Sequence, residues 1–425
     1  MKSLAKMIVA AFLALLARAV ITRYRPKIVM VTGSVGKTST KDAVAAVLMT
    51  RFLVRKSEKS FNSEFGVPFT IFGVKNVKSP SNPLAWLPIF KSALALLILP
   101  NHYPNMLVLE VGADKPGDLA RILRMATPDA VVVTRLPEIP VHVEAYASPM
   151  AVREEEFSPA YALVPGSPLI VCADDPYALD SSVRTSTRII SYGMASNATL
   201  RISDTGFYEE GKKVAGMHMR ILTGGKERSF VVKGSVGVTQ LLPVAAALAT
   251  ATAFDIPPGE ALRALEGYEP PSGRGRLLAG IHGSIIIDDS YNASPAAVEE
   301  ALATLKAFPR AKRRIAVLGD MLELGRYSTM EHERIGALAG TVADIVVAVG
   351  IRARGYASAS SEVEMMLFDN SDAAALALPA FIRSGDVILV KGSQSIRTER
   401  IVEALLANSS DTSNLVRQEP EWKRQ

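Results

Sequence analysis

Short runs of β-branched and other apolar residues alternate with helical patterns along most of the chain after residue 27. Between the first two runs, the segment Lys37–Met49 places Val44, Val47 and Leu48 at the spacing of one helix face. Such alternation is typical of α/β domains with mostly parallel sheets. The strands predicted in this part are Lys27–Thr32, Met106–Val111, Ala130–Thr134 and Leu169–Cys172.

The region 187–235 has a different pattern. TRIISYG, ATLRIS, MHMRILT and RSFVVKG are short runs separated by turns rich in Gly and Asn, which predicts a local antiparallel sheet. An alanine-rich helix is expected to follow from Leu241 to Phe254.

The segment Glu269–Leu277 (EPPSGRGRL) combines prolines with Gly and Ser and is predicted to link two domains. Beyond it the strand–helix alternation restarts with SIIIDD, RIAVLGD, DIVVAVG and DVILVKG. We therefore expect a central α/β domain at 27–270 and a second, Rossmann-like α/β domain at 271–415. An apolar helix at 1–26 precedes them, and a tail at 416–425, without hydrophobic period, is expected at the surface.

The apolar run 7–17 ends at Arg18 and is shorter than the ~20 residues that a membrane span needs. It has no evident signal-peptide cleavage site. Two interpretations remain open: a helix packed in the core, or an anchor at the inner face of the cell membrane, with its basic neighbours on anionic headgroups. A second apolar stretch, 84–100, is interrupted by a proline and a lysine and is open to the same two interpretations. Residues 1–26 and 84–100 are thus the candidates for membrane contact.

Composition and charge restrict the class of protein. The chain has 425 residues, 48% hydrophobic and 21% charged, as in folded globular domains. Its single cysteine, Cys172, excludes an internal disulfide framework and is consistent with the reducing cytoplasm. The net charge of +6 is concentrated near the N-terminus, where the first 60 residues hold twelve Lys or Arg against Asp42 and Glu58. Since the remainder is not generally basic, no nucleic-acid partner is expected.

The strongest local signal is VTGSVGKTST, in which a predicted strand runs through a glycine-containing turn into a helix. Such a P-loop turns backbone N–H groups and a helix N-terminus toward an anion. Its lysine suits the β- and γ-phosphates and its threonine hydroxyl suits Mg²⁺. The loop is one of a shortened form, because Val31 stands where the usual motif has glycine. ATP and Mg²⁺ are the cofactors predicted for Gly33, Ser34, Val35, Gly36, Lys37, Thr38 and Ser39.

Other polar residues follow predicted strands. Glu110 closes an apolar strand, where a carboxylate is costly unless it meets a cation, so a metal role is favoured. His142, taken alone, is by default structural, and Glu154, Glu155 and Glu156 are by default a solvated helix face. Strand ends of the second domain meet at one sheet edge, which predicts a binding cleft. The residues at those strand ends are Asp288, Asp289, Tyr291, Asn292, Asp320, Glu323 and Lys391.

In combination, these segments resemble the Mur ligase family, the ATP-dependent amide-bond-forming enzymes of peptidoglycan precursor synthesis, and are most similar to its D-alanyl-D-alanine-adding members. The resemblance implies that ATP phosphorylates a substrate carboxylate and that an amino acid or dipeptide amine, here D-alanyl-D-alanine, attacks the acyl phosphate. The matching segments, in family order, are TGSVGKTST, FNSEFGVPFT (Phe61–Thr70), LEVGADKPGDL, VHVEAYAS, ADDP, GRGRL, DSYNASP, LGDMLELG and KGSQSIRTE.

The resemblance also implies roles for individual residues. Lys37 would bind the phosphates, Thr38 and Glu110 the first Mg²⁺, and His142 a second. Among the nucleotide contacts implied by the family pattern, Arg274 would reach the phosphate, Asp289 the ribose and Asn292 the nucleotide region. The implied substrate contacts are Asn62, Glu64, Tyr291 and Lys391.

The sequence departs from the family pattern in three places. The P-loop starts at Gly33, which leaves no room for the family's uridine-diphosphate-binding domain, so a different acceptor is expected, such as a lipid-linked one. An alignment without gaps through ADDP puts Glu156 where the family has a carbamylated lysine. Glu156 either supplies a carboxylate for Mg²⁺ and catalysis, or it is an ordinary surface glutamate or is misplaced by the alignment. Val236, Gly237 and Gln240 replace the family's adenine-binding His-Asn…Asn, although the Gln240 amide can still donate and accept.

Two alternative functions stay open at this point. One is an amide ligase for another polymer, such as a polyglutamate. The other is a catalytically silent, nucleotide-binding scaffold at the membrane. The retained Lys37, Thr38, Glu110 and His142 argue against the scaffold, because a decayed site tends to lose its metal ligands.

Overall fold

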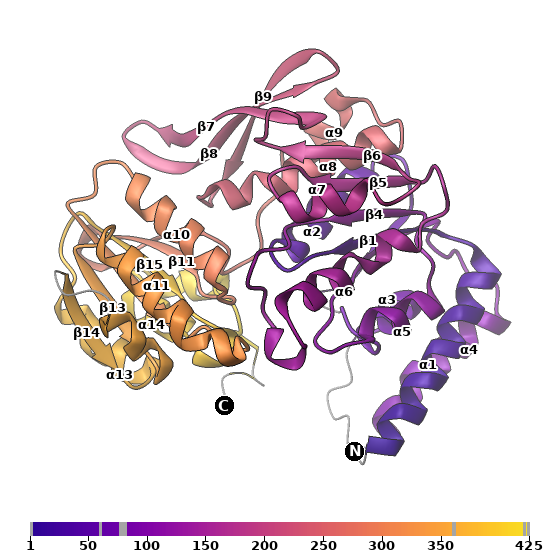
Figure 1. Ribbon diagram of the computed structural model, residues 1–425, viewed down its shortest axis with the longest axis horizontal. Helices are drawn as coiled ribbons and strands as arrows, with labels where there is room; N and C mark the ends of the chain where they lie inside the picture. Colours follow the sequence, from indigo (N-terminus) through magenta and orange to yellow (C-terminus); the bar gives the residue numbers. More distant parts are fainter. Residues whose placement is uncertain (1–2, 59–61, 76–82, 359–362, 420–421, 423–425) are drawn as a thin grey trace.

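The computed structural model describes residues 3–58, 62–75, 83–358, 363–419 and 422. Within these residues the chain forms a nine-stranded and a six-stranded sheet, each covered by helices (Figure 1). The prediction of an α/β fold with mostly parallel strands is confirmed. Some positions used in the predictions lie outside the described residues, namely 1, 2, 61, 420, 421 and 423–425.

The nine-stranded sheet comprises β1 (Lys27–Thr32), β2 (Val54–Lys56), β3 (Met106–Glu110), β4 (Ala130–Val133), β5 (Pro168–Cys172), β6 (Arg188–Gly193), β7 (Leu200–Glu210), β8 (Lys213–Thr223) and β9 (Lys226–Lys233). Their order across the sheet is β2-β3-β1-β4-β5-β6-β7-β8-β9. Neighbours from β2 to β7 are parallel, and β7, β8 and β9 are antiparallel.

The prediction of an antiparallel region over 187–235 is wrong at its start. The run TRIISYG forms β6, which pairs in parallel with β5. The reason is the connection: α7 (Pro176–Ser182) carries the chain from the end of β5 back to the start of β6, as a parallel pair requires. Only the strands from β7 to β9 are joined by tight turns and run antiparallel.

Helices cover both faces of this sheet, and β1 shows how the sequence builds the two layers. Val29 and Val31 point to one core and Ile28 and Met30 to the other, as the alternation of strand side chains requires. The first face carries α2 (Lys37–Leu48), α8 (Leu242–Ala253) and α9 (Pro258–Leu265). The second carries α1 (Ser3–Tyr24), α3 (Gly66–Phe72), α4 (Leu87–Ile98), α5 (Asp118–Met125), α6 (Pro149–Tyr161) and α7.

The six-stranded sheet comprises β10 (Arg276–Ala279), β11 (Ile285–Asp289), β12 (Arg313–Gly319), β13 (Ile345–Val349), β14 (Glu364–Phe368) and β15 (Asp386–Lys391). Its order is β10-β11-β15-β12-β13-β14, and only β10 is antiparallel to its neighbour. One face carries α10 (Pro295–Ala307), α11 (Ser328–Gly340) and α12 (Gly355–Ser358), and the other carries α13 (Ser371–Ala377) and α14 (Glu399–Leu405).

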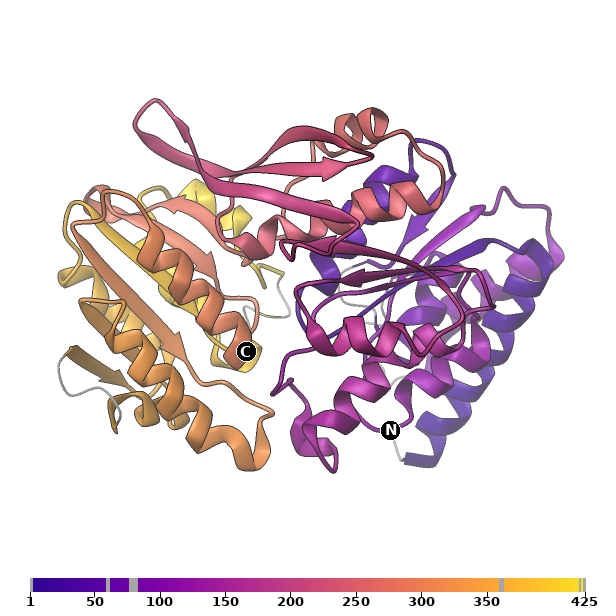
Figure 2. The ribbon, with the colours of Figure 1, turned by 45° about the horizontal axis from the view of Figure 1, so that its top comes forward.

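The two sheets are joined by a shared apolar cluster and by the β7–β8 arm. The arm reaches from the first sheet toward α10 (Figures 1 and 2). On it, Phe207 packs edge-on against Phe308, with ring centroids 5.3 Å apart. Beside that contact, Arg310 Nη2 donates to Glu209 Oε1 over 2.7 Å. The carboxyl ends of parallel strands from both sheets face a common cleft, which Glu110 at the end of β3 and Tyr291 after β11 line.

The C-terminal tail differs from the expectation of a surface segment. Val416 and Arg417 are each only 8% exposed, and Leu415 joins the core beside α14. The sequence pattern did not predict this packing. The segment is not a regular helix or strand, so its buried residues follow no hydrophobic period.

The N-terminal helix α1 is continuous over 22 residues. Leu13 and Val20 are fully buried against its neighbours α3, α4 and α5. Its other face leaves Ile8 and Leu15 61% and 63% exposed. By length and composition, α1 is the one helix in the described part of the chain that could cross a membrane. One face of α1 therefore belongs to the core, as the first interpretation predicted, while the opposite face is apolar and uncovered.

Replacement of Leu13 by Ala tests the packing of α1. Removal of a fully buried leucine side chain leaves a cavity, so we expect the free energy of unfolding to fall by about 3 kcal/mol. Leu15→Ala, on the 63% exposed face of the same helix, is the matched control and should change it by less than about 0.5 kcal/mol. Urea unfolding of the full chain, followed by circular dichroism, measures both; equal small effects would mean that α1 does not pack on the domain.

Candidate active site

The turn between β1 and α2 is held in shape by β4. Gly33 (φ 120°) lies so close to Thr134 that a side chain there would collide with the threonine hydroxyl. Ser34 N and Val35 N donate to Arg135 O over 2.8 and 3.3 Å. Gly36, at φ 87°, then lets the chain enter α2 at Lys37. The order strand, turn, helix is thus the one expected from the sequence, and it leaves the helix N-terminus facing the cleft.

Lys37 bends back over this turn. Its Nζ donates to Gly33 O and lies 3.8 Å from a carboxylate oxygen of Glu156. Ser34 Oγ is buried without a hydrogen-bond partner among the described residues. A buried hydroxyl, a lysine ammonium and the start of a helix therefore converge on one point, which is the chemistry of an anion site.

Glu110 ends β3 beside the same turn and is 1% exposed. Its Oε1 accepts from Thr38 Oγ1 over 3.1 Å, while Oε2 has no hydrogen-bond partner in the described part of the chain and lies 3.7 Å from Lys41 Nζ. Burial raises the pKa of Glu110, and the ammonium groups of Lys41 and Lys37 oppose that rise. The orphaned oxygen beside a threonine hydroxyl fits a hard cation such as Mg²⁺.

The candidate magnesium site offers two side chains, Thr38 and Glu110. No group of three or more His, Cys, Asp or Glu side chains among the described residues is arranged to hold a metal ion. Magnesium needs no such cage, since it commonly takes one or two protein groups and completes its shell with phosphate oxygens and water. Lys41, which the sequence analysis did not select, could have been found from its position one helical turn after Lys37.

Glu156 is not a surface residue, so the default expectation of a solvated face fails there. It is 2% exposed, and its Oε2 accepts from Thr32 Oγ1 over 2.9 Å and from Gly33 N over 3.2 Å. Its Oε1 accepts weakly from Ala113 N over 3.4 Å. The reason is the helix register: α6 buries one face against the sheet, and position 156 lies on that face. Glu154 is exposed, and Glu155 caps the start of α5 through Leu119 N.

His142 lies where the two halves of the molecule meet. Its Nδ1 is 3.0 Å from Glu323 Oε2 of the second half, and its Nε2 is 3.5 Å from Asp114 Oδ1. Burial alone would lower the pKa of His142, but the hydrogen bond and charge of Glu323 outweigh it and raise the pKa. The histidine is thus flanked by carboxylates at the edge of the cleft rather than enclosed in the core.

In the second half, Lys391 is turned toward its own sheet. It is 2% exposed, and its Nζ donates to Asp289 Oδ2 over 2.6 Å and to Asn292 O over 2.9 Å. Burial lowers the pKa of Lys391, and the adjacent Asp289 opposes that shift. Lys391 and Asp289 were predicted as separate site residues. Their pairing follows from strand register, because they are neighbours in the parallel pair β11–β15.

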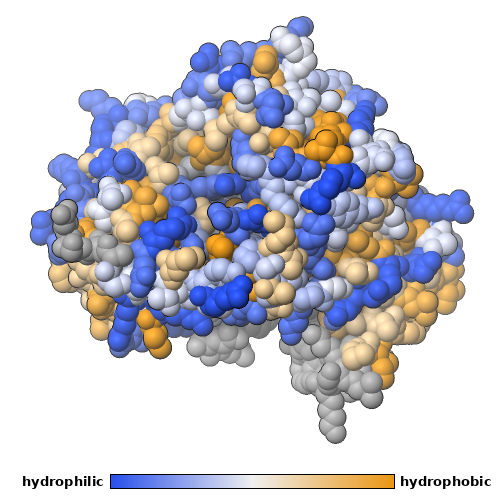
Figure 3. Space-filling view, in the orientation of Figure 1, coloured by the Kyte–Doolittle hydropathy of each residue, from blue (hydrophilic) through white to orange (hydrophobic). Residues whose placement is uncertain are grey.

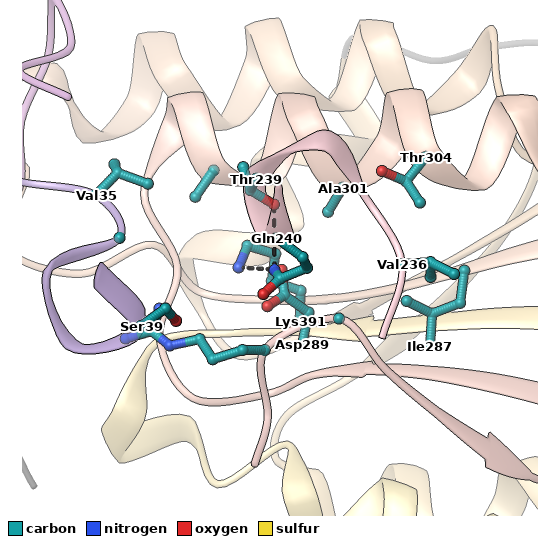
Figure 4. A pocket seen from close by; sticks show the side chains of 14 residues that line it. Val35, Ser39, Val236, Thr239, Gln240, Ile287, Asp289, Ala301, Thr304 and Lys391 are labelled. Carbon is teal, nitrogen blue, oxygen red and sulfur yellow. Dashed lines mark hydrogen bonds and ion pairs between the residues drawn. The ribbon is translucent and has the colours of Figure 1, made fainter. Parts of the chain in front are cut away.

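A narrow pocket lies between the halves, and Figure 4 shows Gln240 and Thr239 facing Asp289 and Lys391 across it. Gln240 Nε2 donates to Thr239 Oγ1 over 3.2 Å. Gln240 Oε1 is buried without a hydrogen-bond partner in the described residues, so it can accept from a ligand. Val236 lines the same pocket, whereas Gly237 lines a separate pocket, where a side chain on it would come within 3.0 Å of Thr304.

A larger cleft of about 490 Å³ continues from this pocket along the P-loop. Arg274 lines both, with its guanidinium 4.1 Å from the centre of the Tyr291 ring. Glu64 is not part of the lining and instead lies 3.5 Å from Arg121. The predicted residues that do line the cleft are Ser34, Val35, Gly36, Lys37, Thr38, Asn62, Glu110, His142, Arg274, Tyr291, Asn292 and Glu323.

Comparison with known proteins agrees with this geometry. The family model for the Mur ligase middle domain matches residues 89–251, and that for the Mur ligase glutamate ligase domain matches residues 273–394. UDP-N-acetylmuramoyl-tripeptide–D-alanyl-D-alanine ligase of Bacillus subtilis is 28% identical over 396 residues, covering 92% of this chain and 78% of its own length. The enzyme of the same name from Mycobacterium bovis is 28% identical over 415 residues, with 92% and 74% covered.

A solved structure points the same way. The MurF ligase from Thermotoga maritima, in complex with ADP, superposes with a TM-score of 0.77 at 25% identity, covering 93% of this chain and 83% of that one. Sequence motifs, fold and both domain models therefore agree, and the chain belongs to the Mur ligase family of ATP-dependent ligases.

Proposed function

We propose that the protein joins D-alanyl-D-alanine, through its amine, to the terminal carboxylate of a peptidoglycan-precursor peptide. The relatives named for that reaction align with nine-tenths of the chain, which supports the substrate class. The observation that carries the proposal is a set of three buried atoms without hydrogen-bond partners among the described residues: Ser34 Oγ and Glu110 Oε2 in the cleft, and Gln240 Oε1 in the adjoining pocket. They match, in order, a phosphate, a metal ion and an adenine amino group.

The cofactor would be ATP with Mg²⁺. Thr38 and Glu110 would hold the ion, which when bound would draw negative charge from the γ-phosphate. Lys37 supplies a point charge at the phosphates, and Arg274 a second one from the other half of the molecule. Gln240 accepts from the base. These groups are fixed before the reaction, so they stabilise developing charge without reorganising.

The chemistry proceeds in two steps. A substrate carboxylate oxygen attacks the γ-phosphorus and displaces ADP, which leaves an acyl phosphate. The amine then attacks the acyl carbon, a tetrahedral intermediate forms, and its collapse expels phosphate. The acyl phosphate would hydrolyse in water, so the contact of the two halves around His142 and Glu323 serves to keep the cleft closed while it exists.

We assign Glu156 the task of the carboxylate that the family obtains from a carbamylated lysine. It places a negative charge 3.8 Å from Lys37 Nζ and binds the P-loop through Gly33 N. Because both of its oxygens already accept protein hydrogen bonds, its action is on the loop and on Lys37, with contact to the metal mediated by water. Asn62, Tyr291 and Asn292, which line the cleft beyond the loop, are proposed to meet the substrate end.

The domain division follows the two sheets: we propose an ATP-binding domain at 27–270 and a ligase domain at 271–415. We also propose that the protein, otherwise cytoplasmic, rests on the inner membrane face through α1 and α4. The outward side of these helices exposes Ile8, Leu15 and Ile98 (61%, 63% and 71%), and Figure 3 shows apolar surface at its lower right, where both helices lie. The exposed Arg18 and Lys91 flank this side and match anionic headgroups.

Lys37→Ala should abolish turnover. Without its ammonium group the charge of the transferring phosphoryl group is left unbalanced, so we expect phosphate release to fall at least ~100-fold. The assay follows phosphate released from ATP in the presence of D-alanyl-D-alanine and a muramyl-peptide acceptor. Lys226→Ala, at the exposed start of β9, is the control and should retain full activity. An active Lys37→Ala variant would contradict the assignment of the P-loop as the phosphate-binding site.

Glu156→Gln should lower kcat by roughly tenfold or more. The amide keeps the shape of the side chain but loses the charge opposite Lys37, and its NH₂ group cannot accept from Gly33 N. Glu154→Gln, exposed on the same helix, is the control. Full activity of Glu156→Gln at saturating ATP and magnesium would show that the carboxylate charge has no part in the reaction.

Vesicle sedimentation tests the membrane contact. The full chain should sediment with vesicles that contain about a third phosphatidylglycerol, and much less with phosphatidylcholine alone. Ile8→Ser combined with Ile98→Ser removes exposed apolar area without touching the core, so it should abolish sedimentation and leave ligase activity unchanged. Equal sedimentation of this variant and the parent would contradict a membrane-resting role for this face.

A further inference from the structure

The C-terminal segment Leu415–Gln418 packs beneath the turn that follows β11. It lies beyond residue 394, where the matched ligase-domain model ends. Val416 and Arg417 are both 8% exposed. A charged side chain with so little access to water must be compensated by protein groups, so its partners show what the segment is for.

Arg417 is compensated by one carboxylate and two backbone carbonyls. Its Nη1 donates to Glu399 Oε2 over 2.8 Å and to Ser290 O over 3.2 Å, and its Nη2 donates to Tyr291 O. Glu399, at the start of α14, is 1% exposed and also accepts from Arg397 Nε. The rigid fork of a guanidinium can bind two successive carbonyls at once, which fixes the path of the backbone between them.

The backbone held in this way carries part of the cleft. Tyr291 N donates to Gly273 O over 3.2 Å, which ties the turn to the linker. Gly273 has φ 67°, and a side chain there would come within 2.8 Å of Val416. The next residue, Arg274, stacks its guanidinium on the Tyr291 ring. Val416 thus packs against the backbone at Gly273, and Arg417 binds the backbone at Ser290 and Tyr291. From these two segments Arg274 and Tyr291 enter the cleft.

We propose that Arg417 is a positioning residue for nucleotide binding: it holds the Ser290–Tyr291 turn, and through the Tyr291 ring it holds the Arg274 guanidinium over the phosphate end of the cleft. The inference rests on the proposed function, since it takes the cleft to be the nucleotide site. It adds a C-terminal determinant, remote in sequence from the P-loop, to the binding of the triphosphate.

A double-mutant cycle on nucleotide affinity tests the proposal. Calorimetric titration of the full chain with Mg·ADP should show binding about tenfold weaker for Arg417→Met and for Arg274→Met. Because both changes disable the same contact, the double variant should bind no more weakly than the weaker single variant. A merely structural role of Arg417 would instead give effects that multiply, to about a hundredfold loss. Arg400→Met, on the same helix as Glu399 but paired with the exposed Asp372, is the matched control and should bind as the parent does.

Other results of the Mg·ADP titration distinguish a failure of the proposed function from a failure of this inference. Parent protein that fails to bind Mg·ADP would overturn the proposed function, and this inference with it. Parent protein that binds, with Arg417→Met binding equally tightly or with multiplying effects, would overturn this inference alone. Should Arg417→Met not fold, Arg417→Lys takes its place: it keeps the charge for Glu399 but cannot reach both carbonyls, so weakened binding of Mg·ADP supports the proposal and parental affinity overturns it.

Discussion

The site depends on two buried carboxylates beside the turn between β1 and α2, and on the lysines that lie next to them. Glu110 and Glu156 are almost inaccessible to water. Glu110 lies near Lys41 and Glu156 lies near Lys37, and both lysines belong to α2. Burying an isolated carboxylate is costly, and a nearby ammonium group offsets part of that cost. Pairing both carboxylates with cations from α2 sets the position of that helix on the sheet. The N-terminus of the helix and the turn before it are therefore located by electrostatics as well as by packing.

The second half of the molecule uses the same device at the facing sheet edge. Asp289 is paired with the buried Lys391 at the ends of adjacent strands, and Glu399 with the buried Arg417 below them. Each pair fixes the turn after β11, from which Tyr291 and Asn292 enter the cleft. Two rigid edges that carry fixed charges, rather than two flexible loops, thus enclose the space where the reacting groups meet, which suits a reaction governed by positioning.

The parts predicted from the sequence are those whose physics is local. The strands, the P-loop and the carboxylate that closes β3 each leave a signal within ten residues, so Lys37 and Glu110 could be selected from spacing alone. Glu156 could not, because three consecutive glutamates look alike until the register of α6 on the sheet shows which one is buried. The parallel pairing of β6 and the burial of Arg417 were missed for the same reason: both are decided by partners far away in the chain.

The backbone is strained on both sides of the junction between the two halves. His142 and Glu323 both have φ 64°, in the left-handed region that costs a non-glycine residue about 1 kcal/mol. These two residues come from different halves of the molecule, and His142 Nδ1 lies 3.0 Å from Glu323 Oε2. Beside them Gly325, at φ 51°, leaves no room for a side chain against Glu144. Such strain persists where the surrounding structure fixes the backbone, and the contact of His142 with Glu323 is part of that structure. The junction of His142 with Glu323 is therefore a fixed point of contact between the two halves, at the edge of the cleft.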